Sequence, residues 1–293
     1  MRLSDILELL LLSALWGGSF LFMRIAAPVI GPVWLIECRV LFAGLALLPF
    51  LLRSRAWSVV LANLKSFFVV GSINSALPFV LLAFASLSLP AGYTSIVNAT
   101  APLFGTLIAA IWLQEKLTIG RLLGLLSGFS GVVLLIGLQP MAITPMVIGS
   151  IVAGLLAALM YAIAAPYAKH HLSGIPPLVT ATMTQLGAAV ALLPLLPWTV
   201  PTVMPAMPIV LAVLALALFS TSFAYLLYFR LIQNIGASKT LTVTYLVPVF
   251  AVLWGALFLR EAITVAMVVG CCLILLGTAI ANGVLFSPPQ QNQ

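Results

Sequence analysis

The chain has 293 residues, of which 63% are hydrophobic and 6% are charged, and its mean hydropathy is +1.27. Soluble globular proteins carry about 25% charged residues, so this composition cannot cover a water-exposed surface. It excludes a soluble enzyme, a disordered protein and a coiled coil. The apolar runs are continuous and do not alternate with a period of two, which argues against an outer-membrane barrel. The sequence therefore predicts an all-α integral membrane protein.

Ten apolar stretches are long enough to cross a hydrocarbon core, which takes about 20 residues. Read between charged and proline-rich breaks, they are 6–27, 33–52, 66–87, 91–113, 119–138, 146–168, 177–197, 208–231, 237–259 and 264–285. The connecting segments are short. We therefore expect ten transmembrane helices and no appended soluble domain.

The distribution of Lys and Arg sets the expected orientation, because cytoplasmic loops carry an excess of basic residues. With the N-terminus inside, the cytoplasmic side holds Arg2, Arg53, Arg55, Lys65, Lys116, Arg121, Lys169, Arg230 and Lys239. The opposite side holds Arg24 and Arg260, and Arg39 lies inside the second span. Both termini are therefore predicted to be cytoplasmic. The net charge of +7 follows from this topology, so we expect the lipid bilayer as partner and no nucleic acid.

The second half of the chain repeats the first at a shift of 146 residues. The matched positions are Pro102 and Pro248, Glu115 and Glu261, Thr118 and Thr264, Gly124 and Gly270, Gly131 and Gly277, Asn74 and Ser220, and Phe79 and Tyr225. We expect two five-helix repeats, 1–140 and 141–293. An odd number of spans inverts the second repeat across the bilayer. Inverted repeats are typical of transporters that alternate access around a midplane site.

The chain resembles the EamA-type modules of the drug/metabolite transporter superfamily. The resemblance lies in Trp16-Gly17-Gly18-Ser19-Phe20, in Arg39 and in the Pro–Glu–Thr–Gly string that ends each half. It implies a ten-helix exporter or facilitator of amino acids and related metabolites in a bacterial inner membrane, most similar to exporters of aromatic and other amino acids. The second half departs from the pattern, with Met160-Tyr161-Ala162 where the first has its Trp-Gly pair.

Pro78, Pro102 and Pro248 lie within predicted spans, and each leaves the carbonyl four residues earlier without its hydrogen bond. In lipid such a carbonyl needs a partner unless it faces protein or a wet cavity. The residue at each freed carbonyl is itself polar: Asn74 before Pro78, Asn98 before Pro102 and Thr244 before Pro248. We interpret these positions as acceptors for the ammonium group of a substrate. The alternative is a structural kink whose polar side chain bonds a neighbouring helix.

Aromatic and small polar side chains share these regions and complete the predicted substrate-binding site. They are Trp16, Ser19, Phe22, Phe79, Tyr161, Ser220, Tyr225 and Tyr245. Stacking and cation–π contacts would favour an aromatic or cationic substrate, whereas ordinary packing is the alternative. Arg39 is added as a partner for a substrate carboxylate or as a lock to another helix, because an intramembrane charge points to function.

The sequence lacks the residues that several other functions would require. No lysine directly follows a glycine, so the ATP-binding Walker signature is missing. His170 and His171 fall together in a predicted loop without a third ligand, so neither a metal site nor an intramembrane catalytic site is expected. Glu115 and Glu261 are expected to hold helix corners beside their basic neighbours. No cofactor and no enzymatic activity are predicted.

The favoured function is an alternating-access carrier for amino acids or similar small metabolites. A sugar-phosphate or nucleotide-sugar carrier would call for several midplane cations, and Arg39 is the only one visible. A passive channel lined by kinked helices is the other alternative, although the antiparallel duplication favours rocking around a central site. The sequence sets no oligomeric state and is compatible with a monomer.

Overall fold

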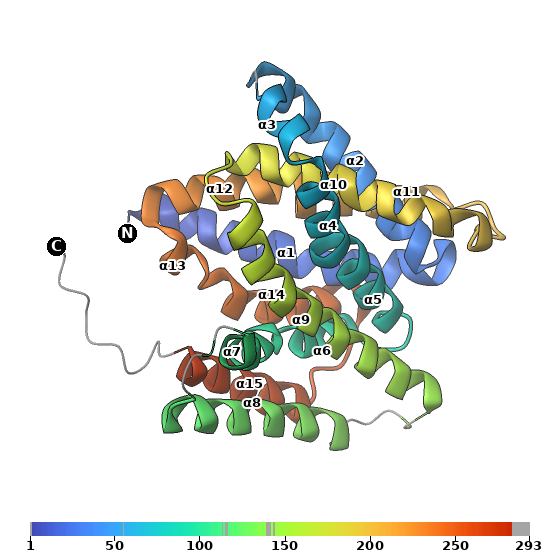
Figure 1. Cartoon of the computed structure of the whole chain (residues 1–293). Coiled ribbons are helices and arrows are strands. Elements are labelled where there is room, and N and C mark those ends of the chain that lie inside the picture. The colour runs from blue at the N-terminus through green and yellow to red at the C-terminus, as the bar shows by residue number, and fades with distance from the viewer. Residues whose placement is uncertain are drawn as a thin grey trace.

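The computed structural model describes residues 2–54, 56–112, 114, 117–138, 142 and 144–282, and every regular element in these ranges is a helix (Figure 1). The α-helices are α1 (Leu3–Ile30), α2 (Pro32–Arg53), α3 (Trp57–Ala62), α4 (Leu64–Gly71), α5 (Leu77–Ala85), α6 (Ala91–Asn98), α7 (Ala101–Trp112), α8 (Ile119–Gly137), α9 (Pro145–His171), α10 (Pro177–Leu192), α11 (Met207–Ala217), α12 (Ala224–Ile235), α13 (Ala237–Thr240), α14 (Val243–Leu259) and α15 (Val265–Ala281). Two π-helical segments, η1 (Ser72–Ala76) and η3 (Leu218–Phe223), and a 3₁₀ segment, η2 (Leu193–Trp198), continue these helices.

Helices occupy all ten predicted spans. Eight helical stretches are long and apolar enough to cross a membrane, and α14 and α15 are shorter apolar helices. The protein is therefore a multi-pass helical membrane protein, as predicted. The orientation of the termini and the boundary at residue 140 stay predictions, and Arg55, Glu115, Lys116 and residues 283–293 lie outside the described residues.

Within the described residues, the third, fourth, eighth and ninth spans depart from a regular α-helix; the sequence analysis expected a proline kink in three of them, but not the form of the irregularity. The third and eighth spans pass through the π-helical segments η1 and η3. The fourth breaks at Ala99–Thr100, and the ninth breaks between α13 and α14. Pro102 therefore lies at the start of α7, whereas Pro78 lies just after the π-helical segment η1, within the helical stretch Leu64–Ala85. Among the three prolines, only Pro248 lies inside an α-helix.

The threonines that the repeat matches cap the helices that follow them. The hydroxyl of Thr118 accepts from the backbone N–H of Arg121, and that of Thr264 accepts from Met267. Each thereby satisfies one of the unpaired N–H groups at a helix N-terminus. The sequence-based expectation for both capping threonines is confirmed.

Helices α8 and α15 lie side by side at the lower edge of Figure 1 and pack through glycines. A Cβ at Gly124 would fall 2.6 Å from the carbonyl oxygen of Gly277, and a Cβ at Gly131 would fall 2.9 Å from that of Gly270. The crossing is therefore antiparallel. Gly270 is the repeat partner of Gly124, and Gly277 that of Gly131, so each contact is the image of the other. A two-fold axis between equivalent helices produces this pattern.

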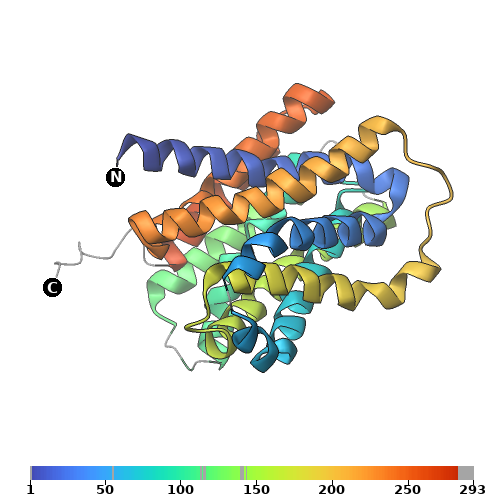
Figure 2. The ribbon, with the colours of Figure 1, turned by 90° about the horizontal axis from the view of Figure 1, so that it is seen from above.

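The first helix of each half packs against the fourth span of the other half: α1 against α14, and α9 against α6 and α7. At Gly17 the two backbones approach closely, because a Cβ there would lie 2.9 Å from the backbone nitrogen of Ala251. In Figure 2, α1 in blue runs beside the α11–η3–α12 stretch in orange. This cross-packing leaves the middle of the bundle to be lined by both halves.

The glycine contacts between α8 and α15 predict a selective cost. In Gly277→Ala the new methyl group would lie 2.4 Å from the backbone nitrogen of Gly128, so the helices must move apart. We expect a loss of about 1–3 kcal/mol in unfolding free energy. In the control Gly120→Ala, the nearest atom is 3.9 Å away, and helix propensity makes that change neutral or stabilising. Thermal unfolding in detergent measures both; equal melting temperatures would contradict the packing argument.

Candidate substrate cavity

A cavity of about 400 Å³ lies in the middle of the bundle. Its lining comes from both halves of the chain. The lining residues are Trp16, Ser19, Phe20, Met23, Arg39, Asn74, Phe79, Leu82, Ser95, Asn98, Ala99, Ala101, Pro102, Tyr161, Ser220, Thr221, Tyr225, Tyr228, Thr244, Tyr245, Val247, Pro248, Leu275 and Thr278. The volume falls within the range of about 300–1,000 Å³ typical of small-molecule sites.

The structure brings most of the predicted site residues together around this cavity. Those that line it are Trp16, Ser19, Arg39, Asn74, Phe79, Asn98, Pro102, Tyr161, Ser220, Tyr225, Thr244, Tyr245 and Pro248. Phe22 and Pro78 do not line it. That any of the predicted residues binds substrate, inside or outside the lining, stays a prediction.

Helix geometry explains why both residues lie outside the lining. On α1 the lining residues are Trp16, Ser19, Phe20 and Met23, with the i, i+3, i+4, i+7 spacing of a single helix face. Phe22 falls outside this stripe and packs against the hydrophobic core. Pro78 directly precedes Phe79, and consecutive helical residues point about 100° apart.

Five polar or aromatic lining residues were missed by the sequence analysis: Phe20, Ser95, Thr221, Tyr228 and Thr278. Two of them carried a usable signal. Ser95 lies three residues before Asn98 and hence on the same face of α6. Tyr228 lies three residues after Tyr225 on α12. The place of Thr221 depends on the π-helical segment, which no local pattern announced.

The lining is duplicated along with the sequence. Seven pairs of lining residues are separated by 146 positions: Asn74 and Ser220, Phe79 and Tyr225, Leu82 and Tyr228, Asn98 and Thr244, Ala99 and Tyr245, Ala101 and Val247, and Pro102 and Pro248. The segments η1 (72–76) and η3 (218–223) also begin 146 positions apart. The cavity thus lies where equivalent elements of the two halves meet.

Unpaired polar atoms face this space. Among the buried side-chain atoms without a hydrogen-bond partner are Ser95 Oγ, Asn98 Oδ1, Ser220 Oγ and Thr278 Oγ1, and all four residues line the cavity. A buried polar atom without a partner costs free energy, so these atoms are poised to bind water or a ligand. The asparagine oxygen can only accept, which suits an N–H donor.

Ring faces form much of the remaining wall. The ring centroids of Trp16 and Tyr228 lie 5.3 Å apart, and those of Phe79 and Tyr161 lie 6.4 Å apart. These spacings are typical of favourable aromatic pairs. The rings come from four different elements (α1, α12, α5 and α9), so packing fixes the shape of the wall. Such a lining accepts an apolar or aromatic body.

A second, more open pocket of about 400 Å³ adjoins the central cavity. The two share Ala101, Pro102 and Tyr161 in their linings. The second pocket lies between α7 and α9 and extends to Lys169 near the end of α9. It extends toward the end of the bundle at which α7 and α9 both terminate.

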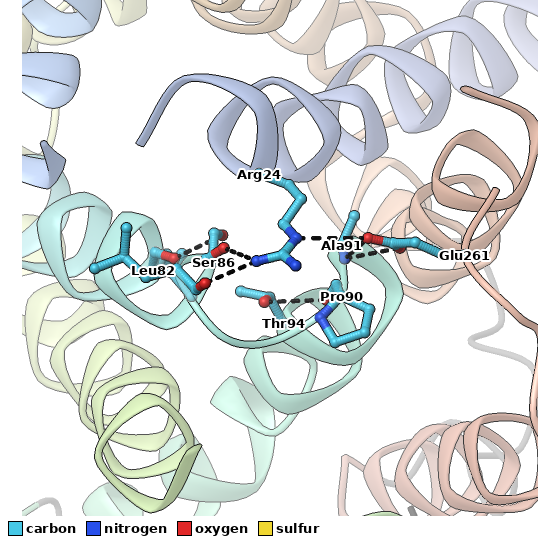
Figure 3. Close-up of polar contacts among 8 residues, drawn as sticks. Arg24, Leu82, Ser86, Pro90, Ala91, Thr94 and Glu261 are labelled. Carbon is cyan, nitrogen blue, oxygen red and sulfur yellow. Dashed lines mark hydrogen bonds and ion pairs between the residues drawn. The ribbon is translucent and has the colours of Figure 1, made fainter. Parts of the chain in front are cut away.

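A polar cluster around Arg24 lies at the opposite end of the bundle (Figure 3). The guanidinium donates to the carbonyl oxygens of Ser86 and Leu87, each at 2.8 Å, and its Nε lies 3.8 Å from the carboxylate of Glu261. The two oxygens of Glu261 accept from the backbone N–H of Ala91 at 3.0 and 3.1 Å. One arginine thus ties α1 to the α5–α6 turn and to the α14–α15 turn.

This cluster corrects the sequence-based account of the corner glutamate. Glu261 was expected to be stabilised by its neighbour Arg260, but its partners are Arg24 and the start of α6. The residue at 260 has φ +56°, a left-handed conformation at the C-terminus of α14. Gly255 makes room for the carboxylate, since a Cβ there would lie 2.3 Å from its Oε2. Local sequence does not reveal these partners because they come from distant segments.

Burial raises the pKa of Glu261 above its ordinary value of 4.5, against the opposing effects of the Ala91 N–H and of Arg24. A raised pKa means that folding favours the protonated form. The contribution of Glu261 to stability is therefore complete at low pH and is lost as the pH rises through the raised pKa.

This sign gives a test with Glu261→Gln, which keeps the shape and removes the titration. The melting temperature of the wild type, minus that of the variant, should fall as the pH is raised from 4.5. Arg260→Gln, a charge change at the same turn, should leave the pH dependence as in the wild type. A difference that grows with pH would mean that the ion pair outweighs the cost of burial.

Together, ten apolar helical spans around an internal cavity of small-molecule size define a multi-pass membrane protein with a central binding space. The EamA-like transporter family model matches the chain twice, over residues 4–137 and 148–283. The chain therefore belongs to the EamA-like transporter family.

Relatives of this chain are similar over nearly their whole length. An uncharacterized transporter from Archaeoglobus fulgidus is 25% identical over 90% of this chain and 94% of its own. The uncharacterized transporter YoaV from Bacillus subtilis is 26% identical over 92% and 94%. The protein PecM from Dickeya dadantii is 25% identical over 93% and 90%. A solved crystal structure with 20% identity matches with a TM-score of 0.65 over 98% of this chain and 100% of that one, which shows the fold alone.

Proposed function

We propose that this transporter is an alternating-access carrier for amino acids, aromatic ones among them, or for similar small metabolites, in a bacterial inner membrane. The observation that carries the proposal is the cavity whose lining pairs at a spacing of 146 residues. A site built from equivalent positions of two inverted halves can be exposed to either side by the same motion. The antiparallel crossing of α8 and α15 supports the inversion.

The two ends of the bundle differ. The Arg24 cluster ties α1 to two turns at one end, whereas the pocket between α7 and α9 extends toward the other. We propose that the tied end is closed and that the end with the pocket is open. With both termini cytoplasmic, as proposed, the closed end faces outward and the open end faces the cytoplasm. The arrangement then corresponds to the state that exchanges substrate with the cytoplasm. Opening outward requires Arg24 to release its partners.

The lining favours an amino acid over a sugar phosphate. A phosphate group carries about two negative charges at neutral pH, and Arg39 is the single cation among the lining residues. Ring faces and unpaired hydroxyl and amide oxygens suit a body with an apolar part and an ammonium group. We propose a small-molecule partner, no cofactor and no nucleic acid.

Asn98 and Thr244 test the proposed site, because they are equivalent positions of the two halves and both line the cavity. Asn98→Ala and Thr244→Ala should each lower uptake into proteoliposomes by about tenfold, the cost of one lost hydrogen bond to a charged group. Their melting temperatures should stay near the wild-type value. Thr199→Ala, an exposed site outside the cavity, is the matched control. Wild-type transport in both cavity variants would remove this site.

Labelling of single cysteines tests the proposed orientation. In a cysteine-free background, Lys65→Cys and Arg260→Cys place thiols at two exposed positions near opposite ends of the bundle. An impermeant thiol reagent added to intact cells should label position 260 and spare position 65 until the membrane is opened. Labelling of both from one side contradicts the topology.

Carrier and channel differ in their kinetics. An alternating-access carrier should show saturable flux and counterflow in proteoliposomes, because each substrate molecule moves with one conformational cycle. Flux that rises linearly with concentration and shows no counterflow would favour a passive channel.

A further inference from the structure

Arg39 is buried in the wall of the cavity and is only partly used by the protein. Its residue exposure is 5%, and its Nε donates to Thr221 Oγ1 at 3.0 Å. Its guanidinium carbon lies over the ring of Phe79, 3.7 Å from the ring centroid. Within the described part of the chain, no hydrogen bond involves its two terminal nitrogens. A guanidinium has five N–H donors, so four remain for another partner.

No acidic side chain balances this charge among the described residues. Asp5 accepts from the backbone of Arg2, Glu8 pairs with Arg230 at 3.2 Å, and Glu261 pairs with Arg24. Glu37 lies two positions away on α2 and therefore on another helix face, and it forms no ion pair with Arg39. An unbalanced cation at membrane depth is costly and marks a functional site.

The repeat shows that the charge is not needed to hold the helices together. Gln185 on α10 is the repeat partner of Arg39, at 39 plus 146, and Ser75 is the partner of Thr221. The amide of Gln185 donates to Ser75 Oγ at 3.0 Å, just as Arg39 donates to Thr221. A neutral amide thus makes the equivalent contact between the halves. Gln185 does not line the cavity, whereas Arg39 does.

From these contacts we infer that Arg39 binds the carboxylate of the substrate, and that the substrate is a compact molecule with one carboxylate on an aromatic or apolar body. This inference rests on the proposed function and names the chemistry of its site. The free nitrogens form the two parallel bonds that a carboxylate accepts. Phe79, Tyr161, Trp16 and Tyr228 contact the body.

Three ligands with the same phenylethyl body test this: 3-phenylpropionate, L-phenylalanine and 2-phenylethylamine. Isothermal titration of the full-length protein in detergent should show tighter binding of the two carboxylates than of the amine. Arg39→Gln, which copies the residue of the other half, should weaken both carboxylates about tenfold or more. It should leave the amine unchanged or tighter. Arg39→Lys keeps the charge without the planar fork, so its loss should be smaller.

Arg53→Gln is the matched control, because it removes the same charge from an exposed position on the same helix. It should bind all three ligands as the wild type does. Elution volume and the melting temperature without ligand check that each variant is folded. If Arg39→Gln does not fold, the selective loss of carboxylate binding in Arg39→Lys carries the test.

The inference is overturned if the wild type binds neither carboxylate more tightly than the amine, or if the Arg39 variants weaken all three ligands equally. Binding is measured independently of transport. The carrier function and the carboxylate-binding role of Arg39 can therefore be refuted independently. Arg39-dependent binding without counterflow would remove the carrier, and counterflow without carboxylate selectivity would remove the role of Arg39.

Discussion

The constraint on which this structure depends is that backbone polar groups inside a membrane must be satisfied by the protein itself. Continuous helices meet it, and most of the chain is continuous helix. Besides the exposed 3₁₀ segment η2 at the end of the seventh span, the described exceptions within the spans are η1, η3 and the breaks at Ala99–Thr100 and before Val243. Each of these four adjoins residues of the cavity lining, where the protein surrounds a polar space.

Side-chain hydroxyls donate hydrogen bonds to backbone carbonyls in the irregular segment η3. In η3, the hydroxyl of Thr221 donates to the carbonyl of Leu216 and that of Ser222 to the carbonyl of Ala217, each five residues earlier. The same two residues reach across to the other half, where Thr221 accepts from Arg39 and Ser222 donates to the carbonyl of Ala43. The π-helical segment therefore satisfies its own backbone and contributes to the cavity wall. Segments of this kind often mark functional sites.

Features with a period or a local cause could be predicted from the sequence. The length of the apolar stretches predicted the spans, and the preference of threonine for helix N-termini predicted the roles of Thr118 and Thr264. The repeat at 146 residues predicted that Asn74 and Ser220 belong to one site. What could not be predicted depends on tertiary contacts. Proline was expected to kink continuous helices, but Pro102 instead begins a new one, and at Pro78 the helix continues through a π-helical segment. The partners of Glu261 come from 170 positions away along the chain, beyond any local pattern.

The duplication also bears on how Arg39, in the role proposed for it, would orient a substrate. Equivalent side chains on both halves make a nearly symmetric wall, and a symmetric wall would bind a molecule in either of two directions. The replacement of a neutral amide at Gln185 by a guanidinium at Arg39 removes this ambiguity, because only one side of the cavity then attracts an anion. The acceptor oxygen of Asn98 adds a site for the opposite charge. The helix packing can therefore stay symmetric, as alternating access requires, while the substrate-binding side chains differ between the two halves.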